Sequence, residues 1–316
     1  MNDKIRVHKL IIVGCGASGM MAGCVAGLFS EDILILDANN VPGKKLLATG
    51  NGKCNYTNSV MNRKCFYSQT DNGVLMKVLE NFNEKDVIKF FEELGIVPRE
   101  KNGGIYPYPE TATAVLDVLR MELERLSVEI KSSVQVKEIR KNKDKFLIDG
   151  EGYDRVIIST GGKAAPKTGS TGDGYLIAKK FNHKILKAVP ALTQMQSNEN
   201  FFKSISGVRT EASLSLFVDG KFIRLSHGEL QLTDYGLSGI CSFELSSIVA
   251  RALDCKQRCL ISVNFYKDFD NNKFADFIKK RIAIHPECTA EQLFTGVFNK
   301  KLTILFLKLS LVPLSR

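Results

Sequence analysis

Residues 8–38, HKLIIVGCGASGMMAGCVAGLFSEDILILDA, contain the pattern that decides the fold. Two apolar runs, KLIIV and DILIL, are typical of buried parallel strands, and a helix of small residues lies between them. Gly14, Gly16 and Gly19 open that helix with GxGxxG spacing. In this arrangement the first glycine permits a tight turn, the second lets the backbone approach a pyrophosphate, and the third lets the helix pack against the strand. The stretch therefore predicts a dinucleotide-binding turn.

The polar groups around this turn indicate which end of a dinucleotide it would hold. The helix N-terminus, at Ala17 and Ser18, offers free N–H groups and a partial positive charge to phosphates. Asp37 ends the second strand, where a carboxylate accepts hydrogen bonds from an adenosine ribose. Because a carboxylate disfavours a 2′-phosphate, we expect FAD or NAD rather than NADP. The alternative is a glycine-rich turn in an unrelated α/β protein, and the ordered strand, turn, helix, strand and acid argue against it.

The segment after the second strand favours FAD over NAD. Residues 41–58, VPGKKLLATGNGKCNYTN, predict a loop rich in N–H groups and lysine side chains instead of the helix of a plain NAD domain. Such a loop can wrap a pyrophosphate and run along a flavin. A flexible surface loop is the alternative, but Leu46 and Leu47 would anchor this one.

The chain farther on follows the order of an FAD domain. Helical periodicity at 72–98 and 111–126 predicts helices over the nucleotide sheet. Residues 128–160 predict β-strands with a hairpin turn at Asp149 and Gly150, and the last strand, RVIIST, runs into two glycines. An antiparallel insertion at this place is the order of FAD domains of the glutathione-reductase type.

With these motifs in view, the chain resembles the bacterial BaiN/YhiN-like flavoproteins, a family of NAD(P)/FAD-dependent oxidoreductases. The resemblance implies an α/β fold, with a Rossmann-like FAD-binding domain of the glutathione-reductase type, an inserted β-rich domain and a helical subdomain. The stretches that carry it cover most of residues 8–240 and are GCGASGMMA, PGKKLLATGNGKCNYTN, IYPYPETATAVLDVL, VIISTGGKAAPKTGSTGDGYLIAKKFNHKI, PALTQM and GELQLTDYGLSG.

The resemblance also implies which residues bind FAD. Val136 would be a strand residue whose backbone reads the adenine. No metal site is expected, and no catalytic residue is named, because Asp234 and Ile240 depart from the family's usual residues near TDYGLSG. The implied cofactor-binding residues are Gly14, Gly16, Ala17, Ser18, Gly19, Asp37, Lys45, Gly50, Asn51, Gly52, Lys53, Cys54, Asn55, Asn58, Val136, Thr160, Gly161 and Gly162.

Two further features have a structural as well as a functional interpretation. Cys54 lies in the expected flavin loop, but no second cysteine is close in sequence, so packing is the default. Residues 168–175, TGSTGDGY, precede a helix and would bind the flavin or a substrate anion, or form a capping turn with Thr171 or Asp173 as the cap.

Changes of pattern along the chain predict three domains. These are residues 1–190, an incomplete FAD-binding domain, residues 191–266, an inserted β-rich domain with a tight turn at Asp219 and Gly220, and residues 267–316, a helical subdomain.

We expect the chain to be truncated at its C-terminus. FAD domains of this type close with a glycine-rich segment, and a single glycine, Gly296, follows Gly239.

Composition bounds the partners and the location. The net charge is +10, but the lysines are spread along the chain, so we expect a small-molecule substrate, no nucleic acid and no membrane. Eight cysteines at irregular spacing are typical of a reduced intracellular protein, which predicts a cytoplasmic location. The sequence gives no indication of the oligomeric state.

The resulting prediction is an FAD-dependent oxidoreductase that moves hydride between NAD(P)H and an unknown organic substrate. NAD(P)H would dock directly against the flavin, because the sequence contains no second GxGxxG. One alternative is a truncated, catalytically inactive remnant with at most weak nucleotide binding. A third possibility is an RNA-binding flavoprotein relative, which the basic charge alone favours.

Overall fold

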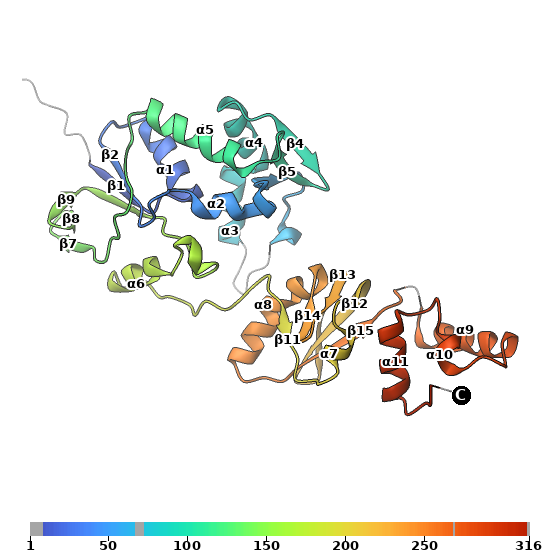
Figure 1. Cartoon of the computed structure of the whole chain (residues 1–316). Helices are drawn as coiled ribbons and strands as arrows, with labels where there is room; N and C mark the ends of the chain where they lie inside the picture. The colour runs from blue at the N-terminus through green and yellow to red at the C-terminus, as the bar shows by residue number, and fades with distance from the viewer. Residues whose placement is uncertain (1–8, 67–72, 268, 315–316) are drawn as a thin grey trace, which may run out of the picture. The chain divides into compact units, whose positions relative to one another are not determined.

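The computed structural model describes residues 9–66, 73–267 and 269–314. The chain divides into two compact units, Met1–Leu186 and Lys187–Arg316, and each is described by itself (Figure 1). The domain boundaries predicted at residues 190 and 266 stay predictions.

A parallel sheet lies at the centre of the first unit. Its strand order is β10-β1-β2-β6, and every neighbouring pair is parallel. This confirms the buried parallel strands predicted around the glycine turn. The strands are β1 (Leu10–Val13), β2 (Ile33–Leu36), β6 (Glu129–Lys131) and β10 (Arg155–Ile158).

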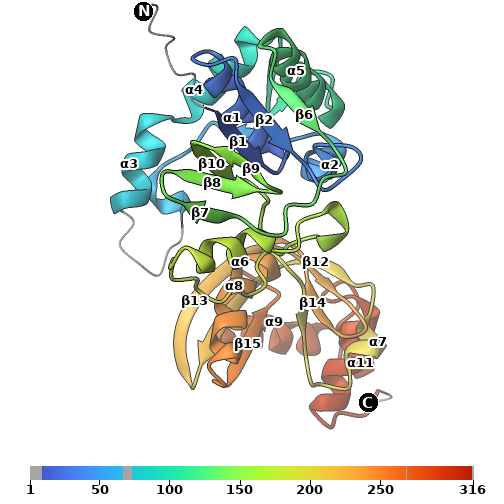
Figure 2. The same ribbon diagram turned by 90° about the vertical axis from the view of Figure 1, so that its left-hand side faces the viewer.

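Both faces of this sheet are covered. Successive side chains of a strand point to opposite faces, so each face packs against a different set of elements. Ile12 and Ile35 pack on one face with helices α1 (Ala17–Gly27) and α5 (Ala112–Arg125). Ile11 packs on the other face with residues of a three-stranded antiparallel sheet and of α6 (Asp173–Lys180). That second sheet contains β7 (Arg140–Asn142), β8 (Lys145–Ile148) and β9 (Glu151–Tyr153) (Figure 2).

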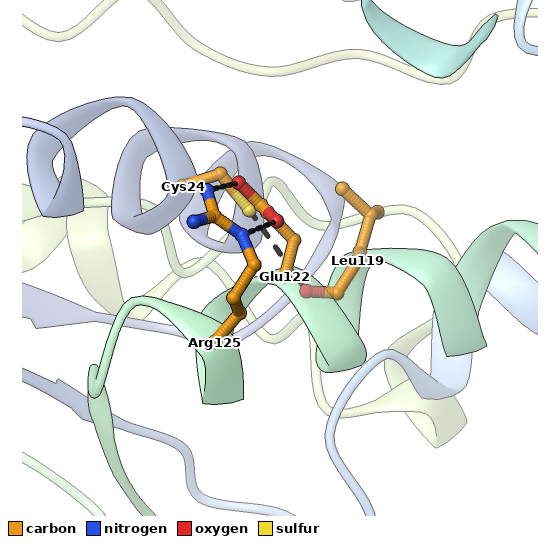
Figure 3. Close-up of polar contacts among 4 residues, drawn as sticks. All are labelled: Cys24, Leu119, Glu122 and Arg125. Atoms are coloured by element: carbon orange, nitrogen blue, oxygen red, sulfur yellow. Dashed lines mark hydrogen bonds and ion pairs between the residues drawn. The ribbon is translucent and has the colours of Figure 1, made fainter. Parts of the chain in front are cut away.

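Helices α1 and α5 approach each other closely because α1 is built of small residues. A Cβ atom added at Gly23 would lie 2.7 Å from side-chain atoms of both Ile35 and Leu123. Figure 3 shows the neighbouring contact, in which the Cys24 thiol lies 3.9 Å from the Leu119 carbonyl oxygen.

The hairpin predicted at Asp149 and Gly150 is confirmed. Both residues have positive φ, and they connect β8 to β9 as an antiparallel pair. The strand expected around Val136 is wrong, because residues 132–139 form no strand.

The insertion between β2 and β6 differs from the sequence prediction in two places. The loop at 41–58 contains a five-residue helix, and the helical stretch at 72–98 is two helices followed by a strand; residue 72 lies outside the described part. Asn83 separates those helices, because its side chain accepts from the N–H groups of Lys85 and Asp86 in a capping box. The elements are α2 (Lys44–Ala48), η1 (Thr49–Gly52), β3 (Thr57–Asn58), η2 (Arg63–Cys65), α3 (Gly73–Asn81), α4 (Glu84–Glu93), β4 (Pro98–Lys101) and β5 (Gly104–Pro107).

The second unit is built on a five-stranded sheet with the order β11-β14-β13-β12-β15. The tight turn predicted at Asp219 and Gly220 is confirmed, since it joins the two longest strands. The strands are β11 (Met195–Gln196), β12 (Arg209–Val218), β13 (Lys221–Leu232), β14 (Gly236–Ser238) and β15 (Cys259–Asn264). The helices are α7 (Phe202–Ile205), α8 (Ile240–Asp254), α9 (Asn271–Ile284), α10 (Ala290–Leu293) and α11 (Lys300–Leu309).

One apolar core holds this second unit together. Leu214, Leu230 and Leu245 are fully buried and join β12, β13 and α8. Leu302 and Leu305 of α11 belong to the same core. None of the described helices is both long and apolar enough to cross a lipid bilayer.

We predict that Leu230→Ala lowers the free energy of unfolding by about 3 kcal/mol, because removing a fully buried side chain loses transfer free energy and leaves a cavity. The matched control on the same strand is Leu225→Ala, whose side chain is 55% exposed and whose loss changes that free energy by less than about 0.5 kcal/mol. Urea unfolding followed by circular dichroism measures both. Equal effects would contradict this placement of the core.

Candidate functional site

The first unit contains a cavity of about 550 Å³ at the carboxyl end of its parallel sheet. Val13 and Leu36 line it at the ends of β1 and β2, and Ser159 lines it directly after β10. In open α/β sheets this edge is where ligands bind.

The three glycines of the turn differ in how closely other atoms approach them. A Cβ atom at Gly14 would lie 2.6 Å from the Ser159 carbonyl oxygen, and one at Gly19 would lie 1.9 Å from the Gly14 carbonyl oxygen. At Gly16 a Cβ atom would have nothing within 4 Å, and Gly16 lines the cavity. The backbone at Gly14 and Gly19 is therefore packed against protein, whereas Gly16 leaves open space above it.

Helix α1 begins at this open space. The N-cap is Gly16, which has no side chain to cap the helix, and the first turn carries no acidic side chain. Ala17 and Ser18 line the cavity. An anion bound there would meet the N–H groups and the positive end of the helix dipole.

Asp37 lies at the same edge with its carboxylate already oriented. The residue is 7% exposed, and its Oδ2 accepts from the Cys15 N–H at 2.6 Å. Its Oδ1 accepts from the Asn39 backbone N–H at 2.8 Å and from the Asn39 side-chain amide at 3.0 Å. A carboxylate has about four acceptor sites, so capacity remains for a ligand hydroxyl.

The loop at 41–58 forms another wall of the cavity. Leu46 is 5% exposed, which confirms the predicted anchoring, and Leu47 is half-buried in the same core. The Lys45 ammonium donates to the Ala164 carbonyl oxygen at 2.7 Å, so it connects this wall to the segment after β10.

The structure brings many of the predicted cofactor residues together at the cavity. Val136 is among them, although it lies outside any strand. Those that line it are Gly14, Gly16, Ala17, Ser18, Asp37, Lys45, Cys54, Asn55, Val136, Thr160 and Gly161. Those outside the lining are Gly19, Gly50, Asn51, Gly52, Lys53, Asn58 and Gly162.

Local contacts explain two of the predicted residues outside the lining. The Lys53 ammonium pairs with the Glu110 carboxylate at 2.5 Å, and Arg99 pairs with the same carboxylate at 3.2 Å. The Asn58 side chain accepts from the Val60 N–H at 2.9 Å.

Several lining residues were missed by the sequence analysis, among them Asn39 and Gln135. For Asn39 the available signal was its position two residues after Asp37. The cap predicted for α6 is wrong, because its N-cap is Gly172 and neither Thr171 nor Asp173 caps it. The Thr171 hydroxyl instead donates to the Asp173 carboxylate at 2.7 Å.

Buried groups near the cavity are held in their protonated forms. Burial, and then the charge of Asp37, raise the pKa of the Cys15 thiol to about 12. Burial also raises the pKa of the Cys54 thiol, which opposes a redox role and supports the packing interpretation. Burial raises the pKa of Tyr56 to about 12, and no described residue hydrogen-bonds to its buried hydroxyl.

One group of potential metal ligands lies in the second unit. The candidate ligand atoms of His285, Glu287 and Cys288, between α9 and α10, lie within 4.8 Å of one another on the surface.

The raised thiol pKa predicts selective alkylation of the folded protein. At pH 8 about one Cys15 thiol in ten thousand is ionised, so iodoacetamide should label the exposed Cys255 and leave Cys15 unlabelled. Mass spectrometry after brief alkylation measures both sites. Labelling of Cys15 at the rate of Cys255 would contradict its burial.

Comparison with known proteins agrees with this geometry. Residues 8–257 match the family described as HI0933-like protein Rossmann domain. A 3-dehydro-bile acid delta(4,6)-reductase of Clostridium scindens is 34% identical, over 96% of this chain and 76% of that protein. A ribosomal RNA dihydrouridine synthase of Escherichia coli is 26% identical, over 96% of this chain and 74% of that protein.

Among solved structures, a flavocytochrome c3 fumarate reductase aligns with a TM-score of 0.45 and 15% identity, over 95% of this chain and 60% of that one. The family match covers more than half of this chain, and the similarity to the reductase extends over 96% of this chain. The chain therefore belongs to the HI0933-like Rossmann-domain family, as its resemblance to the BaiN/YhiN-like oxidoreductases predicts.

Proposed function

We propose that this chain is an FAD-dependent oxidoreductase that transfers hydride from NAD(P)H to an organic substrate. Family membership supports the assignment, as does the printed name of the Clostridium scindens relative, a reductase. The comparisons favour a flavoprotein oxidoreductase over the inactive remnant, because a relative named as a reductase is 34% identical over 96% of this chain.

The observation that carries the proposal is the open space above Gly16. It lies between two glycines that are packed against backbone, at the N-terminus of a helix and beside a buried carboxylate. A pyrophosphate fits that combination, since it needs close backbone approach and a positive helix end. We propose that the diphosphate of FAD binds at Gly16, with the ribose on Asp37.

The remaining lining residues are consistent with the rest of the cofactor. Val136 is buried and offers backbone groups for an adenine, and the loop with Thr49, Cys54 and Asn55 would lie along the flavin. Bound FAD supplies the hydride chemistry, and the protein binds it, orients it and excludes water. Because the thiol of Cys54 stays protonated, we assign that residue to packing.

The printed names of the two relatives refer to different substrates. One is named for a bile acid and the other for ribosomal RNA. We propose a small-molecule substrate here. The absence of a nucleic-acid partner and the cytoplasmic location stay predictions.

We predict that Gly16→Ala abolishes flavin binding while the protein still folds. Gly16 has φ −85°, which any residue adopts, and an added Cβ would have no other residue's atom within 4 Å, so the variant should fold. The added methyl group would occupy the space that we assign to the diphosphate and would obstruct only the bound cofactor. The unchanged protein, mixed with FAD and desalted, should keep the visible absorbance of a flavin, and the variant should lose it.

Gly152→Ala is the matched control, because its Cβ would make contacts of 3.7 Å or more on β9, away from the cavity. It should retain flavin. A Gly16→Ala variant that folds and keeps its flavin would place the cofactor elsewhere.

We further predict that NADH or NADPH, added without oxygen, bleaches the flavin absorbance of the loaded protein. The donor would dock against the flavin, since the single glycine turn is assigned to FAD. Anaerobic absorbance spectroscopy measures the bleaching, with dithionite as the positive control. Flavin that dithionite reduces and both nicotinamides leave oxidised would contradict NAD(P)H as the donor.

A further inference from the structure

Residues 163–170, which we call the strap, follow β10 and contribute Thr168, Gly169 and Ser170 to the cavity lining. Backbone hydrogen bonds make the strap a compact turn. The Thr168 N–H donates to the Ala165 carbonyl oxygen at 2.9 Å, and the Gly169 N–H donates to the Pro166 carbonyl oxygen at 3.0 Å. Its position relative to the cavity therefore depends on what attaches the turn to the rest of the unit.

Two side chains from distant parts of the sequence donate to carbonyl oxygens of the strap. Lys45, on α2, donates to Ala164 at 2.7 Å, and the side-chain amide of Asn39 donates to Thr168 at 3.4 Å. Both residues are half-buried and line the cavity, but the hydrogen bond of Lys45 is exposed, whereas that of Asn39 is partly buried. Asn39 thus makes the more buried of these two attachments.

The shape of the strap is matched to Asn39. Gly169 has φ +91°, and a Cβ atom there would lie 2.4 Å from the side-chain nitrogen of Asn39. The Asn39 amide consequently packs directly on the Gly169 backbone. This contact is independent of the longer hydrogen bond to Thr168.

The same amide also orients Asp37. It donates to Oδ1 of Asp37 at 3.0 Å, and the Asn39 backbone N–H donates to the same oxygen at 2.8 Å. The Asn39 carbonyl oxygen accepts from the Ser133 N–H at 3.0 Å, which fixes the Asn39 backbone. One side chain therefore contacts both the acid and the strap.

We propose that Asn39 is a positioning residue of the adenosine site, which holds the Asp37 carboxylate in its ligand-binding orientation and latches the strap against the cavity. The proposal rests on the proposed function, since it takes Asp37 as the ribose acceptor. An aspartate has nearly the shape of asparagine but has no amide donor, and it would place a second carboxylate beside Asp37. Both roles should therefore be lost when Asn39 becomes either alanine or aspartate.

Binding of ADP to the full chain, measured by titration calorimetry, tests the first role. We expect Asn39→Ala to weaken ADP binding about tenfold, and Asn39→Asp at least as much, because a charged acceptor loses its orienting donor. The neighbouring exposed Asn40 does not line the cavity, and Asn40→Ala should leave the affinity unchanged. If Asn39 acts through Asp37, the fold-loss of ADP affinity in the double variant Asp37→Ala/Asn39→Ala should be smaller than the product of the fold-losses in the two single variants.

Hydrogen exchange of the protein without ligand tests the second role. The amides of Thr168 and Gly169 should exchange faster in Asn39→Ala and Asn39→Asp than in the unchanged protein and in Asn40→Ala. Multiplicative losses of ADP affinity would overturn the positioning of Asp37, and unchanged exchange would overturn the latch. An unchanged protein that binds no ADP would overturn the proposed function and the role at Asp37, whereas the exchange experiment would still decide the latch. Asn39→Asp supplies the same readouts if the alanine variant fails to fold.

Discussion

The close approach of three backbone segments at the β1–α1 turn is the constraint on which the first unit depends. The Gly14 backbone lies against the Ser159 carbonyl group, and Gly19 lies against Gly14, so a side chain at either position would meet backbone. The Ser159 hydroxyl donates to the Gly14 carbonyl oxygen at 2.7 Å and also to Val13 at 3.0 Å. This contact ties the end of β10 to the start of α1.

The geometry of the cavity follows from that contact. With the turn fixed, the N-terminus of α1 is directed at the edge of the sheet, and Gly16 remains the position where backbone meets open space. The next strand brings Asp37 to the same edge, where the Cys15 N–H of the turn donates to its carboxylate. The phosphate-binding and ribose-binding features are therefore parts of one hydrogen-bonded structure.

Sequence reasoning predicted the parts of this site that local pattern determines. The glycine spacing, the apolar strands, Asp37 and the turn at Asp149 and Gly150 each depend on neighbouring residues, and the structure has them where they were expected. Family resemblance added Val136, which lines the cavity but lies in a segment that forms no strand.

The parts that were missed depend on contacts between distant residues. Asn39 meets Thr168 and Lys45 meets Ala164 only after the strands have aligned, and no periodicity encodes such a pair. Lys53 carries the positive charge expected of a phosphate ligand, yet its ammonium pairs with the carboxylate of Glu110 in the segment after β5. The short helix α2 was also missed, because the glycines around it favour a loop.

We propose that the carboxyl edge of the first unit's parallel sheet holds FAD through the open space above Gly16 and the buried carboxylate of Asp37. A crystal structure of this chain grown with FAD tests it most directly. We predict that the diphosphate lies within hydrogen-bond distance of the N–H groups at the start of α1, and that the adenosine ribose lies on the carboxylate of Asp37. FAD bound with its diphosphate away from Gly16, or its ribose away from Asp37, would contradict it.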